Sequence, residues 1–334
     1  MVAASLALCG AWGILVATSL LLAALCLNHT KNLIYEITGA FLIFFGIMCA
    51  WVFPGISSAL EAARYCNCEN NLKMIGLALC NYNDAHKHFP AVNICDKDGK
   101  SLISWRVEIL PMMEYGSLYN SIKKDESWNS PLNAKVLNQV MPEYVCPSDN
   151  HEKDDITTTN YVAIIGPGTA WHEDGPVRLS DLPDGGAHTV MAVEVANSGV
   201  HWAEPRDLTV DEALERMKTG QGLRISSTHP SRINILFASD SVRSLPSKMP
   251  ISVWKKLLAG EIMDLDNIES MIDPSAPDMV DVSIHPSGPG KWPIILSIIV
   301  WLLSVALLFR RAIKSRRKPE AAEQHPQIAQ MNAD

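Results

Sequence analysis

Three long apolar runs stand out in the pattern of hydrophobic and polar positions. Residues 2–27 and 292–309 carry no charged side chain, and residues 33–52 carry only Glu36. A helix needs about 20 apolar residues to cross the hydrocarbon core of a bilayer. Buried core helices are the alternative, but uncharged runs of this length in an otherwise polar chain favour three transmembrane helices.

Positive charges predict how these helices are oriented. The segment RRAIKSRRK, residues 310–318, follows the third run, and basic residues favour the cytoplasmic side of a membrane. Tracing the chain back places residues 55–291 on the extracytoplasmic side. The polar tail, residues 319–334, has few large apolar residues and is predicted to be disordered.

The segment after the second run is amphipathic and predicts a long helix from Ser57 to about Ala85. Pro90 ends this helix, because proline cannot continue it. Its apolar residues recur at helical spacing: Ile56, Leu60, Ala63, Leu72, Ile75, Leu79 and Tyr82.

Beyond the helix, the pattern changes to short strands. Residues 157–166 and 188–196 are rich in β-branched and apolar residues, which is typical of strands. Residues 233–238 and 241–245 predict a hairpin around Ser239 and Asp240. Short helices are expected at about 112–122, within 123–142 and at 253–262, and long extended connections at 167–187 and 197–222. The predicted fold class is α+β, with a pilin-like N-terminal helix packed on one face of an antiparallel sheet.

These elements divide the chain into six predicted segments. They are a first transmembrane helix with a short cytoplasmic loop (1–32), a second, pilin-like transmembrane helix (33–54), an extracytoplasmic α+β domain (55–263), a linker (264–291), a third transmembrane helix (292–309) and a basic, then disordered cytoplasmic tail (310–334).

Charge limits the choice of partners. Residues 55–291 hold 21 Lys and Arg against 32 Asp and Glu, a net charge of −11. Such an excess of negative charge argues against a nucleic-acid partner. The partners expected instead are the lipid bilayer and other envelope proteins.

Cysteine usage predicts disulfides in the external domain. Cys66, Cys68, Cys80, Cys95 and Cys146 lie there, and this odd number leaves at least one thiol unpaired. Our hypothesis is a Cys68–Cys146 bridge between the long helix and the Cys-Pro-Ser-Asp loop, with Cys80–Cys95 as a second bridge. The Cys66-Asn67-Cys68 pair is not a zinc knuckle, since no second pair follows at ligand spacing.

Several ordered motifs resemble a known bacterial family. They are ALEAARYCNCENNLKMIGLALCNYNDAHKHFP, SWRVEILPMMEYGSLYN, VCPSDN, LPDGGAHTVMAVEVANSGVHWAEPRDL and THPSRINILFASDSVRSL. Together they resemble domain-of-unknown-function family 1559, over about residues 33–260. The resemblance implies a prepilin-type N-terminal segment, a C-terminal His-x9-Asp-Gly motif and a solute-binding-like description. Since the family is bacterial, the three predicted transmembrane helices are expected to lie in the bacterial cytoplasmic (inner) membrane.

The chain departs from the family pattern at both ends of this match. Ile37 stands where the family has a glutamate, with Glu36 one residue early, and the cleavage junction is Asn32-Leu33 rather than Gly-Phe. We therefore expect an uncleaved, permanent anchor. At the other end, Ser239-Asp240 replaces Asp-Gly after His229, so that motif is interpreted as a hairpin turn.

Candidate catalytic residues lack the spacing of known sites. A metal site needs converging ligands, and none lie at the tight spacing of a metal motif. The Gly-x-Ser-x-Gly elbow of hydrolases is missing too. Glu194 alternates with valines and is assigned to the solvated face of a strand, and His201-Trp202 to a packed edge. The other candidates considered are His172, His229, Asp149 and Asp240.

The family-matched residues are therefore predicted to be structural, with no catalytic residue, no metal and no cofactor. They are His229, Ser239, Asp240, Asn70, Asn71, Lys73, Cys146, Pro147, Ser148 and Asp149. Two functions remain open. The favoured one is a non-enzymatic, membrane-anchored pilin-like module of the cell envelope, and the alternative is an extracytoplasmic protein that binds a small molecule or a metal. A hydrolase is a distant third.

Overall fold

The computed structural model describes residues 33–149, 157–262 and 264–284. The chain divides into two compact units, residues 59–286 and residues 1–58 with 287–334. Helix α2 (Leu33–His86) has residues in both units, and all the other described elements belong to residues 59–286.

The unit of residues 59–286 combines helices with short strands. After α2 its helices are α3 (Trp105–Glu108), η1 (Leu110–Met113), α4 (Gly116–Ser121), α5 (Pro131–Leu137), η2 (Pro142–Tyr144), η3 (Leu179–Asp181), η4 (Pro183–Gly186), α6 (Val210–Thr219), α7 (Ile251–Leu258) and η5 (Ile268–Met271). Its strands are β1 (Asn93–Cys95), β2 (Ser101–Ser104), β3 (Tyr161–Ile165), β4 (Val190–Glu194), β5 (Leu208–Thr209), β6 (Arg232–Phe237), β7 (Val242–Pro246), β8 (Lys248–Pro250) and β9 (Met279–Asp281).

A five-stranded sheet in the order β5-β3-β4-β6-β7 forms the centre of the unit. Strands β3, β4, β6 and β7 pair antiparallel, whereas β5 pairs parallel with β3. Two smaller antiparallel pairs, β1-β2 and β8-β9, lie outside this sheet. The architecture is thus α+β with antiparallel and mixed sheets.

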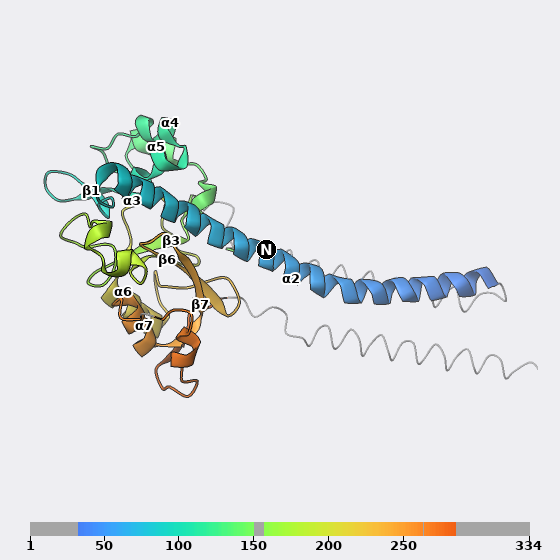
Figure 1. Cartoon of the computed structure of the whole chain (residues 1–334). Coiled ribbons are helices and arrows are strands. Elements are labelled where there is room, and N and C mark those ends of the chain that lie inside the picture. Colours follow the sequence, from blue (N-terminus) through green and yellow to red (C-terminus); the bar gives the residue numbers. More distant parts are fainter. Residues whose placement is uncertain (1–32, 150–156, 263, 285–334) are drawn as a thin grey trace, which may run out of the picture. The chain divides into compact units, whose positions relative to one another are not determined.

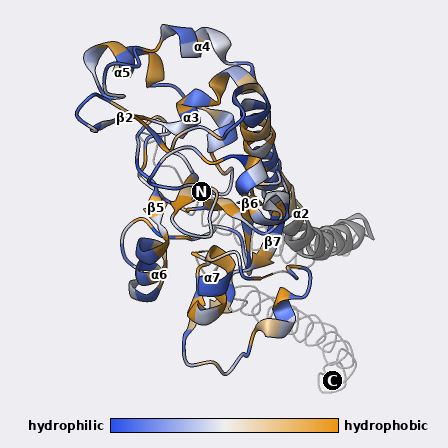
Figure 2. Cartoon of the chain, turned by 60° about the vertical axis from the view of Figure 1, so that its left-hand side comes forward, coloured by the Kyte–Doolittle hydropathy of each residue, from blue (hydrophilic) through white to orange (hydrophobic). Residues whose placement is uncertain are grey.

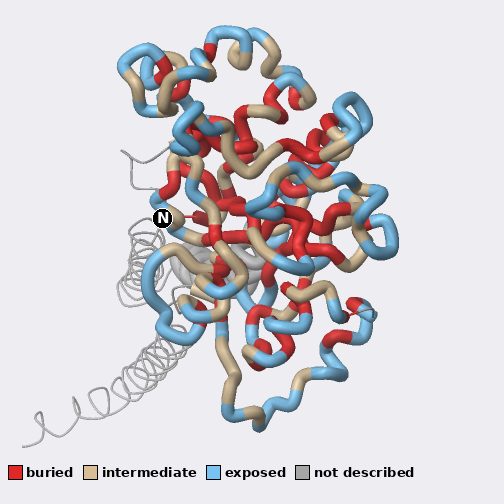
Figure 3. The backbone as a smooth tube through the Cα atoms, turned by 90° about the vertical axis from the view of Figure 1, so that its left-hand side faces the viewer, coloured by how far each residue is buried: buried red, intermediate tan, exposed pale blue. Residues whose placement is uncertain are grey.

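Both faces of the sheet are buried, by different helices. On β3, Tyr161 and Ala163 belong to a core that includes Leu72, Ile75 and other residues of α2. Their neighbours Val162 and Ile164 belong to a second core with residues of α6 and α7. Figure 1 shows α2 running along the sheet past β3 and β6, and Figure 3 shows that the buried chain is concentrated at the centre of the unit. Figure 2 shows the corresponding hydrophobic colour on β5, β6 and α7.

Two parts of this architecture differ from the sequence prediction. Residues 210–219, expected within an extended connection, form helix α6 and cover the second face of the sheet. Residues 279–281, expected within a linker, form strand β9, which pairs with β8.

The predicted membrane topology is not supported. The runs 2–27 and 292–309 lie outside the described residues, and the run 33–52 lies in α2. Within the parts of the chain that the structure describes, no helix combines the length and the apolar character needed to cross a bilayer. This finding overturns the three-span fold and the location assigned from it in the cytoplasmic membrane.

Gly168 lies where the turn after β3 meets the end of α7, and we expect Gly168→Ala to be strongly destabilising. Its backbone has φ +83°, and an added Cβ would lie 2.5 Å from the carbonyl oxygen of Ala259. The left-handed conformation costs a residue with a Cβ about 1–2 kcal/mol. The overlap with backbone atoms adds about 1–3 kcal/mol. Urea unfolding should therefore show a loss of about 3 kcal/mol.

Gly99→Ala is the matched control for this prediction. Gly99 has φ +80°, but an added Cβ there would meet no atom within 4 Å. In Gly99→Ala only the left-handed backbone conformation lowers the free energy of unfolding, by about 1–2 kcal/mol. Equal losses in the two variants would show that the approach of Ala259 does not matter.

Candidate functional site

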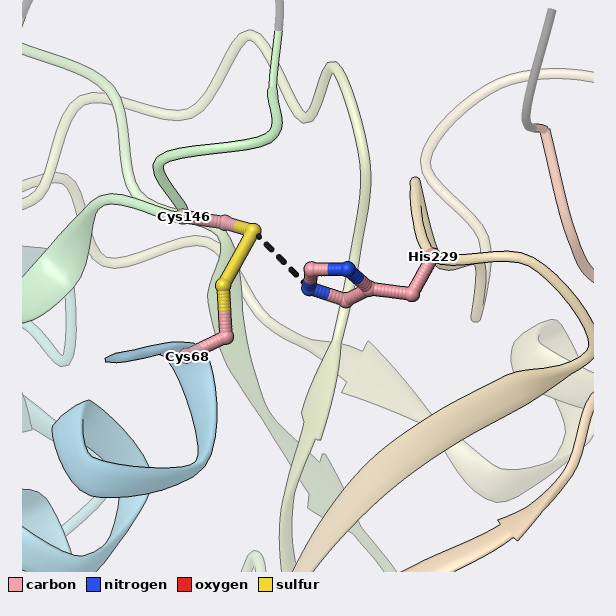
Figure 4. Close-up of side chains that lie close together, drawn as sticks. All are labelled: Cys68, Cys146 and His229. Carbon is pink, nitrogen blue, oxygen red and sulfur yellow. Dashed lines mark hydrogen bonds between the residues drawn. A yellow bond between two sulfur atoms is a disulfide. The ribbon is translucent and has the colours of Figure 1, made fainter. Parts of the chain in front are cut away.

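Three segments that are far apart in the sequence meet beneath helix α2. The helix contributes Glu61, Tyr65 and Cys68, the loop after η2 contributes Cys146, and the segment before β6 contributes His229. We call Glu61, Cys68, Cys146 and His229 the cystine–histidine cluster. Figure 4 shows the ring of His229 directed at the sulfur atoms of the two cysteines.

Cys68 and Cys146 form a disulfide, the first of the two bridges expected from the sequence. Their Cα atoms are 5.3 Å apart, and the bridge ties α2 to a loop 78 positions later. The second expected bridge is not formed, because Cys80 and Cys95 are free thiols, as is the exposed Cys66. Burial raises the pKa of the Cys80 thiol to about 11.

His229 is buried and is held from both sides of its ring. Its Nδ1 lies 2.9 Å from Oε1 of Glu61, and its Nε2 lies 3.4 Å from Sγ of Cys146. The ring of Tyr65 packs edge-on against it, with ring centroids 5.0 Å apart. The Ser148 hydroxyl donates to the same Glu61 oxygen at 2.9 Å, so the carboxylate is fixed in place. Helix and loop therefore orient the imidazole together.

Glu194 contradicts its assignment to a solvated strand face. It is 3% exposed and accepts three hydrogen bonds, from the Ser227 hydroxyl at 3.0 Å and from the backbone and side-chain nitrogens of Asn234 at 3.0 and 2.9 Å. Burial raises the pKa of this carboxyl, and the hydrogen bonds of Asn234 oppose the rise. The assignment failed because both faces of the sheet are covered, so no strand face here is exposed to solvent.

Asp149 closes the loop that carries Cys146. Its Oδ2 accepts from the backbone nitrogen of Asn197 at 2.8 Å and from the Asn160 side chain, while Oδ1 has no hydrogen-bond partner among the residues that the structure describes. Asn160 in turn accepts from the backbone nitrogen of Cys146 at 2.7 Å. The Cys-Pro-Ser-Asp loop is thus fixed by its own polar side chains, and Pro147 lies half-buried within it.

The other predicted motif residues lie outside the cluster. Asn71 donates to the carbonyl oxygens of Pro142 and Val145, which fastens α2 to the Cys-Pro-Ser-Asp loop, whereas Asn70 is exposed. Lys73 forms an ion pair with Glu69, one turn before it on the helix.

Ser239 and Asp240 lie in the turn between β6 and β7, as the sequence predicts. Asp240 has φ +65°, a conformation that aspartate tolerates better than most residues. The connection between the two strands spans four residues, 238–241. The turn also lies against α2, because an added Cβ on Gly76 would be 3.3 Å from the Asp240 Cα.

The two remaining candidate histidines take no part in the cluster. His172 is exposed. The ring of His201 stacks on Trp128 with centroids 4.7 Å apart and on Trp202 at 5.7 Å. Burial lowers the pKa of His201 to about 4, so the ring is neutral at pH 7. His201 therefore packs as an aromatic residue.

Tyr65 and Asn234 connect the cluster to the sheet and were not among the predicted residues. The Tyr65 hydroxyl donates to the Asn234 side-chain oxygen at 2.8 Å and also contacts the Ser244 hydroxyl. Asn234 is a buried polar residue within an apolar strand, INILFA, and this is the signal that could have identified it.

The space beside the cluster is small. The cavity next to Cys146, lined also by Asn160, Glu194 and Thr228, measures about 10 Å³. A cavity of this size holds about one water molecule. This cavity is therefore too small for an organic ligand.

Glu194 should leave a signature in the pH dependence of stability. Because its carboxyl has a raised pKa, the folded state keeps a proton at pH values where the unfolded state has lost it. The free energy of unfolding should therefore fall as the pH rises from the unfolded pKa through the folded one. In Glu194→Gln this part of the pH dependence should disappear, which urea unfolding at successive pH values would measure.

The pH dependence must be measured for both wild type and Glu194→Gln, because other carboxyl groups also change stability with pH. Hydrogen bonds lower the pKa values of Asp264, Asp273 and Asp278, and these groups change stability in the opposite direction. Their contribution is common to wild type and variant, so it cancels in the difference. Parallel curves above pH 4.5 would contradict a buried, proton-retaining Glu194.

Comparison with known proteins supports the family resemblance. Residues 57–209 match the profile of the family described as "Protein of unknown function (DUF1559)", also named SBP_bac_10. This range is shorter than the residues 33–260 expected from the motifs, and it includes Cys68, Cys146 and Glu194 but ends before His229. No curated protein and no solved structure is a significant match. Through residues 57–209, then, the chain resembles the DUF1559 family of proteins of unknown function.

Proposed function

We propose that the chain is a non-enzymatic, pilin-like interaction module that associates with a second copy of itself through the outward face of helix α2. The observation that carries this proposal is the composition of that face. We define the α2 outer face by the exposed residues between Leu60 and Asn81, before the exposed Asp84 near the end of the helix: Leu60, Ala62, Ala63, Cys66, Asn67, Asn70, Lys73, Met74, Leu77 and Asn81.

Charge is nearly missing from the α2 outer face. Lys73 is its one charged member, and it is paired with Glu69. Leu60 and Leu77 are each 54% exposed and Met74 is 47% exposed. The solvent-facing side of a surface helix is normally charged or polar, whereas interface cores are depleted of charge and enriched in residues such as Met. This composition favours a covered face.

A second copy of the chain is the occupant that the charge distribution favours. Residues 55–291 carry a net charge of −11, so two copies repel each other over most of their surfaces. Repulsion is smallest where both copies present uncharged residues. The amides of Asn67, Asn70 and Asn81 are donors and acceptors at once, so this face can pair with itself about a two-fold axis.

The buried polar groups beneath α2 support a structural rather than a catalytic role. Glu194 and Glu61 have their hydrogen-bonding capacity taken up by neighbouring side chains. The cavity of about 10 Å³ beside Cys146 is far below the roughly 300 Å³ of a small-molecule site.

Sedimentation of the full chain over a range of concentrations tests the proposal. Wild type should show a reversible monomer–dimer equilibrium, and Leu77→Lys should shift it at least tenfold towards monomer. Leu132→Lys is the matched control, since Leu132 is 53% exposed on a different helix, α5. The control should leave the equilibrium unchanged.

Cys66 provides an independent readout, because its exposed thiol lies on the same face. A short bis-maleimide should crosslink two wild-type chains through Cys66, and Cys66→Ser or Leu77→Lys should abolish the product. A chain that stays monomeric at every concentration, or a Leu132→Lys variant that dissociates as readily as Leu77→Lys, would refute self-association through α2.

A further inference from the structure

One ring nitrogen of His229, Nε2, faces a disulfide sulfur that cannot donate a hydrogen bond to it. His229 is 1% exposed, and its Nδ1 lies 2.9 Å from a carboxylate oxygen of Glu61, which can only accept a hydrogen bond when ionised. In the neutral ring, Nδ1 therefore carries the proton and Nε2 presents its lone pair. The atom that faces Nε2 is Sγ of Cys146 at 3.4 Å, a disulfide sulfur with no proton to donate.

This arrangement would suit a metal ion if the two sulfurs were thiolates. Sγ of Cys68, Sγ of Cys146 and a ring nitrogen of His229 all lie within 4.8 Å of one another. In a tetrahedral zinc site, with Zn–S of about 2.3 Å and Zn–N of about 2.0 Å, ligand atoms are roughly 3.5–3.8 Å apart. Small side-chain movements would bring the three donors to those separations.

We propose that Cys68, Cys146 and His229 bind one zinc ion when their disulfide is reduced, and that the disulfide and the zinc site are alternative states of the same cluster. Reduction adds two electrons and two protons to the two sulfurs, and a dithiol reductant becomes its own disulfide in return. Zinc binding then releases the two thiol protons to solvent.

The surroundings of His229 are those of a metal-binding histidine. A ligating histidine commonly donates its second ring N–H to a carboxylate, which fixes the tautomer and raises the basicity of the ligand. Glu61 occupies this position and is itself held by Ser148. Arg64 lies 3.4 Å from the other oxygen of Glu61 and offsets its charge.

Charge and space also fit. Two thiolates, one neutral imidazole and Zn²⁺ sum to zero, so the buried centre would carry no net charge. Zinc with three protein ligands keeps a fourth position for water. Of the three proposed ligands, Cys146 lines the neighbouring cavity of about 10 Å³, which has room for about one water molecule.

The spacing of these residues does not predict a metal site, because Cys68 and Cys146 are 78 positions apart and His229 follows 83 positions later. The proposal concerns the cluster beneath α2 and does not depend on the α2 outer face. Either can fail without the other.

Zinc content measured in the two redox states tests the proposal. The full chain is reduced with a water-soluble phosphine, which takes an oxygen atom from water as it is oxidised, then incubated with zinc and desalted without oxygen. One zinc per reduced chain and none per oxidised chain are expected. With cobalt(II) in place of zinc, the reduced chain should show thiolate-to-cobalt charge-transfer absorption.

Variants identify the ligands. His229→Gln should weaken zinc binding by at least about a hundredfold, and Glu61→Gln by about 10–100-fold, the usual effect of losing a carboxylate behind a ligand. The matched control is Cys66→Ser/Cys80→Ser/Cys95→Ser, which removes the free thiols found in the described part of residues 59–286 and should bind zinc as wild type does. Cys9, Cys26 and Cys49 are kept in both proteins. Thiol counts and circular dichroism of the oxidised His229→Gln variant show whether it still folds and forms the disulfide.

Three results would overturn the proposal. They are a reduced, folded chain that takes up no zinc, zinc binding that survives His229→Gln unchanged, and zinc binding that is lost in Cys66→Ser/Cys80→Ser/Cys95→Ser.

Discussion

Asp207→Ala is expected to lower the free energy of unfolding by about 4 kcal/mol. Asp207 and Arg106 form an ion pair 2.6 Å long in which both side chains are fully buried. Removing one partner of such a pair leaves an uncompensated buried charge and costs about 3–5 kcal/mol. Native domains are stable by about 5–15 kcal/mol, so the variant would lose a large share of its stability.

Asp207 also satisfies other buried donors. The carboxylate oxygen that pairs with Arg106 accepts the backbone N–H of Ala163 in β3 at 2.7 Å and the indole N–H of Trp105 at 3.4 Å. Arg106 donates further to the carbonyl oxygen of Tyr161 at 3.0 Å. The pair thus joins α3, β3 and the segment that leads into β5. Burial raises the pKa of Asp207, and the charge of Arg106 opposes that rise.

Urea unfolding of five variants separates these contributions: Asp207→Ala, Asp98→Ala, Arg106→Met, Asp207→Asn and the combination of the last two. Asp98→Ala, at an exposed aspartate, should change stability by no more than about 0.5 kcal/mol. Arg106→Met combined with Asp207→Asn removes both charges, and its loss should be smaller than the sum of the two single losses. A loss below about 1 kcal/mol in Asp207→Ala would mean that water reaches Arg106 when the carboxylate is removed.

The parts of the fold that follow local patterns could be predicted from the sequence. The apolar spacing from Leu72 to Tyr82 places the buried side of α2, and the β-branched runs place β3, β4, β6 and β7. Leu60 and Ala63, which the same spacing assigned to that side, are exposed. These patterns arise from contacts that repeat along one element, so a single sequence contains them.

Helix α6 was missed although its signals are present. Thr209 and Glu212 form a capping box, and Gly220 ends the helix with φ +69°. Only Ala213 and Met217 of this helix are buried, so its apolar stripe is short and the periodicity is weak. For this helix the capping residues are a stronger signal than the periodicity. Because the periodicity alone does not predict the helix, it does not predict that the second face of the sheet is covered.

The contacts between buried polar side chains could not have been predicted from a single sequence. Asp207 and Arg106 are 101 positions apart, and His229 and Glu61 are 168 apart. Nothing in the spacing of either pair indicates contact, because it is the sheet and α2 that bring the residues together. The same reason explains Glu194, whose alternation with valines fits a solvated strand as well as a covered one.

The disulfide shows how α2 is fastened to the rest of the fold. Apart from side-chain packing, α2 is joined to the Cys-Pro-Ser-Asp loop by Asn71, by the Glu61–Ser148 hydrogen bond and by the bridge itself. The bridge acts mainly on the unfolded chain, by closing a long loop and reducing its conformational entropy.

Removing this bridge should therefore cost about 4 kcal/mol. For residues 78 positions apart, the chain-entropy relation lies between about 3 kcal/mol for a 15-residue loop and about 4.7 kcal/mol for a 100-residue loop. Cys68→Ser/Cys146→Ser in metal-free buffer should show this loss in urea unfolding, with a steeper dependence on urea because the uncrosslinked unfolded chain exposes more surface. Cys66→Ser/Cys95→Ser, at two exposed free thiols, is the control and should change stability by no more than about 0.5 kcal/mol. If the first double variant were as stable as wild type, packing and the hydrogen bonds of Asn71 and Glu61 would be enough to hold α2 in place, and the bridge would add no stability.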